Sequence, residues 1–227
     1  MCGRVVQKTP LSEIRVLFET VNPVPNAAPT YNGAPTDNLP IVRLDRDGRR
    51  SLDLFRWGLI PYWAKDKSLG ARCINAMRET VISKPAFRDA FRQRRCLVPA
   101  DFFYEWKTTP AGKQPYAVGI ADGTPMAFAG LWERWREPVA GDVLHSFTII
   151  TGPPNELVSP IHNRMPIILP PEAWRLWLGE ERTDIEELVD LLRPYPADLM
   201  RAYPVGKRVG SVRNNDPALL DPLVMAA

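Results

Sequence analysis

Cysteine and histidine are scarce in this chain. Its 227 residues include three cysteines, Cys2, Cys73 and Cys96, with no Cys-x-x-Cys pair, and two histidines, His145 and His162. A structural zinc site needs four nitrogen or sulfur ligands at short, paired spacings. The sequence therefore predicts no metal site. An odd number of cysteines also suits a reducing cytoplasm, where thiols stay free, and we expect a cytoplasmic protein.

Long apolar stretches and nucleotide-binding glycine motifs are absent. No stretch approaches 18 uninterrupted apolar residues, and no apolar signal-peptide core follows the first methionine, so we expect neither a membrane span nor secretion. Neither Gly-x-Gly-x-x-Gly nor Gly-x-x-x-x-Gly-Lys-Ser/Thr occurs, which leaves no evident cradle for a nucleotide. We expect no cofactor. Because no repeat or linker divides residues 1–227, a single domain is predicted.

The chain also has little net charge, +3 at pH 7 with an isoelectric point near 8.8. A polyanionic partner would therefore have to meet a local basic patch instead of a global field. The densest basic run contains Arg92, Arg94 and Arg95. That run is equally compatible with the solvated face of a helix.

The pattern of apolar residues predicts many short strands with helices around them. Helices are expected at residues 11–20, 85–94, 171–178 and 183–192, the last opened by a capping box of Thr183 and Glu186. Strands are expected at residues 39–44, 51–57, 96–98, 102–107, 116–121, 126–132 and 147–151, and residues 21–40 are expected to be irregular. This order favours an α+β fold with a central antiparallel, barrel-like sheet flanked by short helices.

Among the residues that the sequence does contain, Cys2 at the second position is the most distinctive. A small side chain there normally permits removal of Met1, after which Cys2 would carry both a thiol and a free α-amine. An α-amine has a reference pKa of about 7.7–8.0, against about 10.4 for lysine, so roughly a tenth of it is neutral and nucleophilic at pH 7. The alternative is that Cys2 is an ordinary small residue near the chain terminus.

Three polar residues interrupt apolar runs, and each has a functional and a structural interpretation. Glu105 follows three aromatic residues, so its carboxyl group faces either solvent or a lined pocket, where desolvation would raise its pKa. His162 lies in a tight turn beside Arg164 and is a candidate for acid–base chemistry or phosphate contact, or a structural histidine. Asn75 ends a short strand-like run, where amides often cap turns. Trp57 and Trp63 suit either base stacking or core packing.

Eight short segments follow one another in a specific order. They are Met1-Cys2-Gly3-Arg4, Tyr31-Asn32 with Ala34-Pro35, Trp57-Gly58-Leu59, Asn75-Ala76 with Glu79-Thr80, Arg95-Cys96-Leu97-Val98-Pro99-Ala100-Asp101, Phe103-Tyr104-Glu105-Trp106, Ala129-Gly130-Leu131-Trp132 and His162-Asn163-Arg164-Met165-Pro166. Together these segments resemble the SRAP family, the SOS-response-associated, abasic-site-processing proteins. The resemblance extends from Cys2 to about Leu223.

The resemblance implies a protein that binds single-stranded DNA containing abasic sites, as a monomer, associated with the nucleoid if the source is bacterial. It implies a thiazolidine crosslink between Cys2 and the ring-opened abasic deoxyribose, with lyase-like and autopeptidase activity. By the family pattern, Asn75 positions the amine or the sugar, Glu105 moves protons, and His162 assists opening of the sugar and reversal of the crosslink. The candidate DNA contacts are Arg4, Asn32, Pro35, Trp57, Arg78, Thr151 and Arg164.

The sequence departs from the family pattern at three positions. Met77 follows Ala76 where an arginine is frequent, Phe102 precedes the aromatic run where a glycine is common, and Asn163 replaces a common aspartate. These departures leave Cys2 in place and bear on the DNA contacts.

Two other classes of function compete with this interpretation. Class II glutamine amidotransferases also begin with Met-Cys-Gly, so Cys2 could serve an N-terminal-nucleophile amidohydrolase or peptidase. The further glutamine-binding motifs of those enzymes are absent from the sequence. A non-catalytic module that binds single-stranded DNA is the third alternative.

Overall fold

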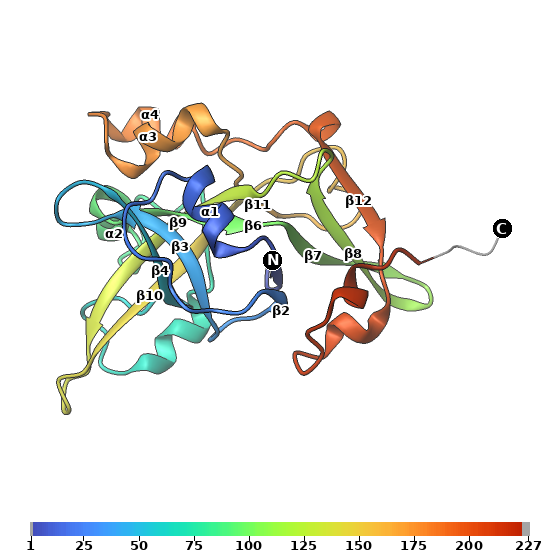
Figure 1. Ribbon diagram of the computed structural model, residues 1–227, viewed down its shortest axis with the longest axis horizontal. Coiled ribbons are helices and arrows are strands. Elements are labelled where there is room, and N and C mark those ends of the chain that lie inside the picture. Colours follow the sequence, from blue (N-terminus) through green and yellow to red (C-terminus); the bar gives the residue numbers. More distant parts are fainter. Residues whose placement is uncertain (1, 224–227) are drawn as a thin grey trace.

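The computed structural model describes residues 2–223, and its centre is a closed five-stranded barrel (Figure 1). The strands follow one another around the barrel in the order β10-β4-β3-β6-β9, and β9 pairs again with β10. Their bounds are β3 Asn38–Leu44, β4 Arg50–Trp57, β6 Arg95–Ala100, β9 Met126–Arg136 and β10 Val143–Gly152. The predicted α+β fold with a barrel-like sheet is confirmed. One pairing departs from the antiparallel expectation, because β10 and β4 run parallel.

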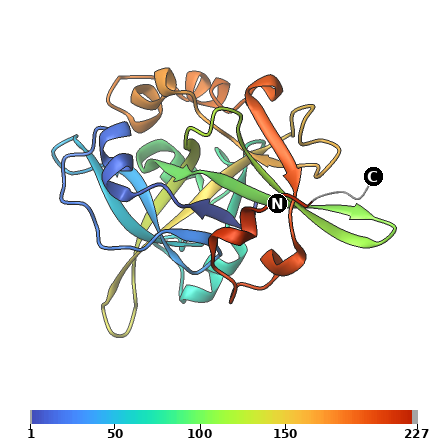
Figure 2. The same cartoon turned by 45° about the vertical axis from the view of Figure 1, so that its right-hand side comes forward.

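A second sheet lies beside the barrel, in the strand order β12-β8-β7-β1-β2. Its strands are β1 Val5–Gln7, β2 Thr30–Gly33, β7 Phe102–Thr109, β8 Gly112–Ile120 and β12 Met200–Pro204. Strands β6 and β7 are separated by one residue, Asp101, so the chain passes directly from the barrel into this sheet. The β7–β8 hairpin projects from the body of the molecule (Figure 2). The sequence did not predict β1, β2 or β12, and β2 lies in the segment expected to be irregular.

Two short strands extend β10 beyond the barrel. They are β5 Asn75–Met77, which is parallel to β10, and β11 Met165–Pro166, which is antiparallel to it. β10 therefore carries the segments that contain Asn75 and His162 to the same end of the barrel.

The helices are short and pack around the barrel (Figure 1). They are α1 Leu11–Leu17, α2 Arg88–Gln93, α3 Trp174–Leu178 and α4 Ile185–Asp190, with five 3-10 segments at η1 Lys67–Arg72, η2 Pro171–Ala173, η3 Ala197–Leu199, η4 Lys207–Gly210 and η5 Pro217–Leu220. Trp177 of α3 donates a 2.9 Å hydrogen bond to the Cys96 carbonyl of β6, which fixes α3 on the barrel. The predicted capping box was wrong, because Asp184 caps α4 and its carboxylate accepts from Glu187 N.

The barrel interior is filled by large side chains from alternate positions of its strands. Trp57 is fully buried and stacks on Phe147, with 6.1 Å between the ring centroids. Arg43, near the end of β3, lies opposite the start of β4. Its guanidinium group is 5.0 Å from the centroid of the Trp132 ring and 2.9 Å from Asp53. Trp57 lies where β4 ends. The two ends of the barrel therefore differ: an arginine fills one, and the segment around Cys2 packs at the other.

Candidate active site

Cys2 lies directly before β1 and is fully buried. It packs in the same apolar cluster as Trp57, Phe103 and Ile149, between the barrel and the second sheet. Burial raises the pKa of the Cys2 thiol far above its ordinary value, and the negative charge of Glu105 raises it further. The thiol is therefore protonated at neutral pH. A reaction that uses this sulfur needs a base close by, because the thiolate is the nucleophilic form.

Glu105 is brought to Cys2 by the pairing of β1 with β7. Val5 lies opposite Phe103, and Tyr104 N donates to the Arg4 carbonyl at 3.0 Å, so the same register continues toward residues 2 and 3. The Glu105 side chain is buried, with 2% of its surface exposed. Desolvation raises the pKa of this carboxyl group, and attraction to the His162 ring partly opposes the shift. Of the two interpretations of Glu105, the structure supports the pocket and excludes the solvent-facing residue.

His162 completes this group from the loop between β10 and β11. Its Nε2 atom lies 3.9 Å from Oε2 of Glu105. Its Nδ1 atom faces the backbone of Arg164, with 3.1 Å to the amide nitrogen and 3.2 Å to the carbonyl oxygen. The ring is therefore held with one nitrogen on the protein backbone and the other toward the buried carboxyl group, a geometry suited to proton transfer.

Asn75 lies at the start of β5, opposite Ile149 of β10. Its Nδ2 atom donates to the Ile74 carbonyl at 3.0 Å, whereas its buried Oδ1 atom has no hydrogen-bond partner among the described residues. Buried polar atoms are normally paired, so an exception calls for a ligand or a water. The free acceptor is consistent with an amine or a hydroxyl group being bound there.

Two of the predicted DNA contacts do not fit their positions. Trp57 is fully buried, and its indole N–H donates to the Ile74 carbonyl at 2.8 Å, so it is a core residue and not a stacking surface. Asn32 is 3% exposed, and its Nδ2 atom lies 3.0–3.2 Å from the carbonyl oxygens of Val209, Ser211 and Asn214. The Asn32 side chain therefore fastens the C-terminal segment to β2. The residue type, asparagine, did not reveal this structural role.

The other candidate contacts lie nearer the surface, with one exception. Arg4, Pro35, Arg78 and Arg164 are partly exposed, whereas the Thr151 side chain is buried. Arg164 is already engaged: its guanidinium group contacts both oxygens of Glu79, at 2.7 and 2.9 Å, and the Thr151 carbonyl at 2.6 Å. The DNA contacts at Arg4, Pro35 and Arg78 stay predictions.

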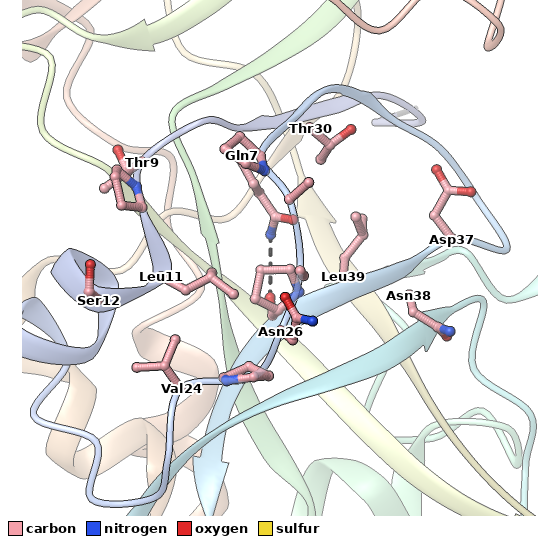
Figure 3. A pocket seen from close by; sticks show the side chains of 16 residues that line it. Gln7, Thr9, Leu11, Ser12, Val24, Asn26, Thr30, Asp37, Asn38 and Leu39 are labelled. Carbon is pink, nitrogen blue, oxygen red and sulfur yellow. Dashed lines mark hydrogen bonds between the residues drawn. The ribbon is translucent and has the colours of Figure 1, made fainter.

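A cavity of about 450 Å³ lies at the far end of β1, away from the Cys2 group (Figure 3). It is enclosed by the start of α1, residues 24–30 and the start of β3. Gln7 lines it, and its Nε2 atom donates to the carbonyl oxygens of Pro99 at 2.6 Å and Pro40 at 3.3 Å. This side chain ties β1 to β6 and β3, so its role here is structural.

The profile of a family described as SOS response associated peptidase (SRAP) matches residues 1–212. The chain belongs to the SRAP family. It is 43% identical over 224 residues to the abasic site processing protein YoqW of Bacillus subtilis (strain 168), which covers 97% of this chain and 99% of that protein. It is 33% identical over 225 residues to the abasic site processing protein HMCES of Gallus gallus, which covers 86% of this chain and 66% of that protein.

Solved structures share the architecture of this SRAP chain. A crystal structure of a protein from Bacteroides thetaiotaomicron superimposes with a TM-score of 0.89 at 26% identity, covering 98% of this chain and 100% of that one. The fold is therefore the SRAP fold. Among residues 2–223, no helix has the length and hydrophobicity needed to cross a membrane, and no three His, Cys, Asp or Glu side chains gather as a metal site.

The SRAP site also contains features that sequence reasoning did not assign. Glu79 was part of a motif but received no role, although it binds Arg164 through both carboxylate oxygens. Tyr62 and Trp63 are 56% and 48% exposed, unusually high for large aromatic side chains. They lie in the loop that joins β4 to β5, close in sequence to Asn75. Trp63 was noted as a possible stacking residue, and its exposure favours that interpretation.

Proposed function

We propose that this SRAP chain captures abasic sites in single-stranded DNA as a covalent thiazolidine crosslink at Cys2. The observation that carries the proposal is the burial of the Cys2 thiol beside the Glu105–His162 pair. A buried, protonated thiol is a poor nucleophile, but it suits a second step in which a neighbouring base removes its proton. The abasic deoxyribose supplies an aldehyde when its ring opens. An abasic site as the substrate also fits the names of the relatives.

The chemistry requires the free α-amine of Cys2, so Met1 must be removed first. Met1 lies outside the described residues, and its removal, by the protein itself or by an aminopeptidase, stays a prediction. The neutral amine attacks the C1′ aldehyde to give a carbinolamine, and loss of one water gives an imine. The Sγ atom then adds to C1′, the thiol proton passes to the nitrogen, and a five-membered thiazolidine ring closes. Holding both nucleophiles on one residue gives the second step a high effective molarity.

The neighbouring side chains have distinct tasks in this sequence. Glu105, whose pKa is raised by burial, donates the proton that leaves with water and then accepts the proton of the thiol. The unpaired Oδ1 atom of Asn75 accepts from the amine and orients it. His162 assists opening of the sugar and the reversal of the link. The imine also permits elimination of the 3′ phosphate, which would account for a lyase-like activity.

Exposed aromatic and basic side chains in the loop between β4 and β5 supply a surface for single-stranded DNA. Tyr62, Trp63, Lys65 and Lys67 are exposed in the loop that ends at Asn75. Aromatic faces stack on bases without sequence preference, and lysines attract the phosphates. A chain with a net charge of only +3 would concentrate its DNA affinity on such a local surface.

An oligonucleotide assay tests the proposal directly. Single-stranded DNA with one abasic site should give a denaturation-resistant adduct with the wild-type chain, and matched intact DNA should give none. Cys2→Ala should abolish the adduct but keep DNA binding, because only the reacting group is lost. Cys96→Ala is the matched control, since Cys96 is also fully buried but lies within the barrel, and it should keep the adduct.

An unchanged adduct yield in Cys2→Ala would refute the proposal. Glutamine hydrolysis without an adduct would instead support an N-terminal-nucleophile amidohydrolase.

A further inference from the structure

The Arg164 side chain is fixed at three points. Its two terminal nitrogens contact the two carboxylate oxygens of Glu79 at 2.7 and 2.9 Å, and Nη2 also contacts the Thr151 carbonyl at 2.6 Å. The Arg164 side chain is 16% exposed, and the Glu79 side chain is 42% exposed. A two-point arginine–carboxylate contact fixes orientation as well as distance. The guanidinium group is therefore held in one place between the turn after β5 and strand β10.

The backbone of the same arginine holds the ring of His162. The Arg164 amide lies 3.1 Å from Nδ1 of His162, and its carbonyl oxygen lies 3.2 Å from the same atom. These two contacts exclude each other, because Nδ1 accepts from the amide only when it lacks a proton and donates to the carbonyl only when it carries one. The backbone of Arg164 therefore offers Nδ1 either a donor or an acceptor, and which of the two contacts forms decides the tautomer of His162.

We propose that Glu79 is a positioning residue for His162 and acts through Arg164. Glu79 anchors the arginine side chain, the anchored residue presents its amide N–H to Nδ1, and the neutral ring then carries its proton on Nε2. That proton points to Glu105, whose Oε2 atom lies 3.9 Å away. This inference rests on the proposed function in one respect: the His162–Glu105 pair is taken to transfer protons during capture of the abasic site.

Two features separate this role from direct contact with DNA. The nitrogens of Arg164 that face Glu79 and Thr151 are occupied, and its Nε atom is buried without a partner in the described part of the chain. Little of the arginine is left for a phosphate. The Arg164 contact also lowers the pKa of the Glu79 carboxyl group, so the ion pair persists throughout the neutral range. The pair is only partly exposed, and its two-point contact holds the arginine in one orientation, which is the positioning role proposed here.

Imidazole nitrogen NMR on the folded, full chain tests the proposal without any substrate. In alkaline buffer the wild-type protein should show His162 as the Nε2–H tautomer, and Glu79→Ala should give a mixture of both tautomers. Glu181→Gln is the matched control, because Glu181 forms an exposed 2.8 Å pair with Arg175, and it should leave the His162 signals unchanged. Glu79→Gln serves as a second variant if Glu79→Ala does not fold.

Adduct formation on abasic single-stranded DNA gives the functional comparison. Glu79→Ala should slow it about tenfold, less than the roughly 10²-fold loss expected of His162→Ala, with affinity for intact DNA unchanged. A wild-type tautomer in both Glu79 variants would overturn the proposal, and so would a change in DNA affinity without a change in tautomer. Absence of any adduct with the wild-type chain would refute the proposed function instead, and the NMR comparison would still decide the role of Glu79.

Discussion

Burial acts on two acids of the site in the same direction. The Cys2 thiol and the Glu105 carboxyl group both have raised pKa values, chiefly because the charged form of each would lie in a desolvated pocket. An acid whose pKa is raised in this way can donate a proton when a reaction intermediate needs one. Catalytic groups of this kind are usually held at the expense of folding stability.

This predicts a pH-dependent gain of stability in Glu105→Gln. A carboxyl group with a raised pKa in the folded state contributes stability that is fully present below its unfolded pKa and is lost as the pH rises through the folded pKa. At pH 7 the variant should therefore melt about 2–4 °C higher than the wild type, which corresponds to about 1 kcal/mol at this chain length. Melting curves at pH 4 and pH 7 provide the measurement. A variant less stable than the wild type at pH 7 would contradict the assignment.

Single residues show what the sequence could and could not predict. Glu105 stands out because it interrupts an aromatic run, and the structure gives it a buried place beside His162. Trp57 and Asn32 were predicted as DNA contacts and are both buried, because residue type does not tell which side of a strand faces the core. The role of Glu79 was missed because its partner Arg164 lies 85 positions away, and no local pattern encodes such a contact.

At the scale of elements, the C-terminal segment depends on one amide. The Asn32 side chain at β2 donates to three carbonyl oxygens within residues 209–214. Of these three acceptors, the Val209 carbonyl belongs to a buried residue, and leaving a buried acceptor unpaired costs about 1–3 kcal/mol. Asn32→Ala should therefore speed amide hydrogen exchange in residues 205–223 while the barrel keeps its protection. Asn38→Ala, at an exposed position, is the control, and equal exchange in both variants would argue against this attachment.

The sequence predicted most barrel strands but not the short elements. β3, β4, β6 and β9 have apolar runs bounded by turn residues, and their positions agree with the prediction to within a few residues. β1, β2 and β11 have two to four residues each, too few for a periodic pattern. β1 and β11 each pair with a longer strand, β7 and β10, and β2 in turn pairs with β1.

At the scale of the whole molecule, closure of the barrel depends on a position without a side chain. A Cβ atom at Gly130 of β9 would lie 2.9 Å from Cys96 Sγ and 3.1 Å from the Thr148 carbonyl, atoms of the two neighbouring strands. Gly130→Ala should therefore destabilise the fold by about 1–3 kcal/mol through overpacking. Thermal unfolding measures this, with Gly206→Ala as control, because nothing lies within 4 Å of a Cβ atom there. A Gly130→Ala chain as stable as the control would show that the strands can separate.

The pairings of strand β10 also affect the order in which parts of the molecule fold. It pairs with β4, β5, β9 and β11, and its parallel contact with β4 joins Ser146 to Arg56. Contacts between positions so distant in the chain form slowly, because a large loop must close, with a loss of chain entropy, before these contacts can stabilise the fold. His162 follows β10 in the chain, so it reaches Cys2 and Glu105 only after β10 has paired with these neighbours. The complete reactive pocket is thus a late product of folding, and a partly folded chain carries its cysteine without His162 beside it.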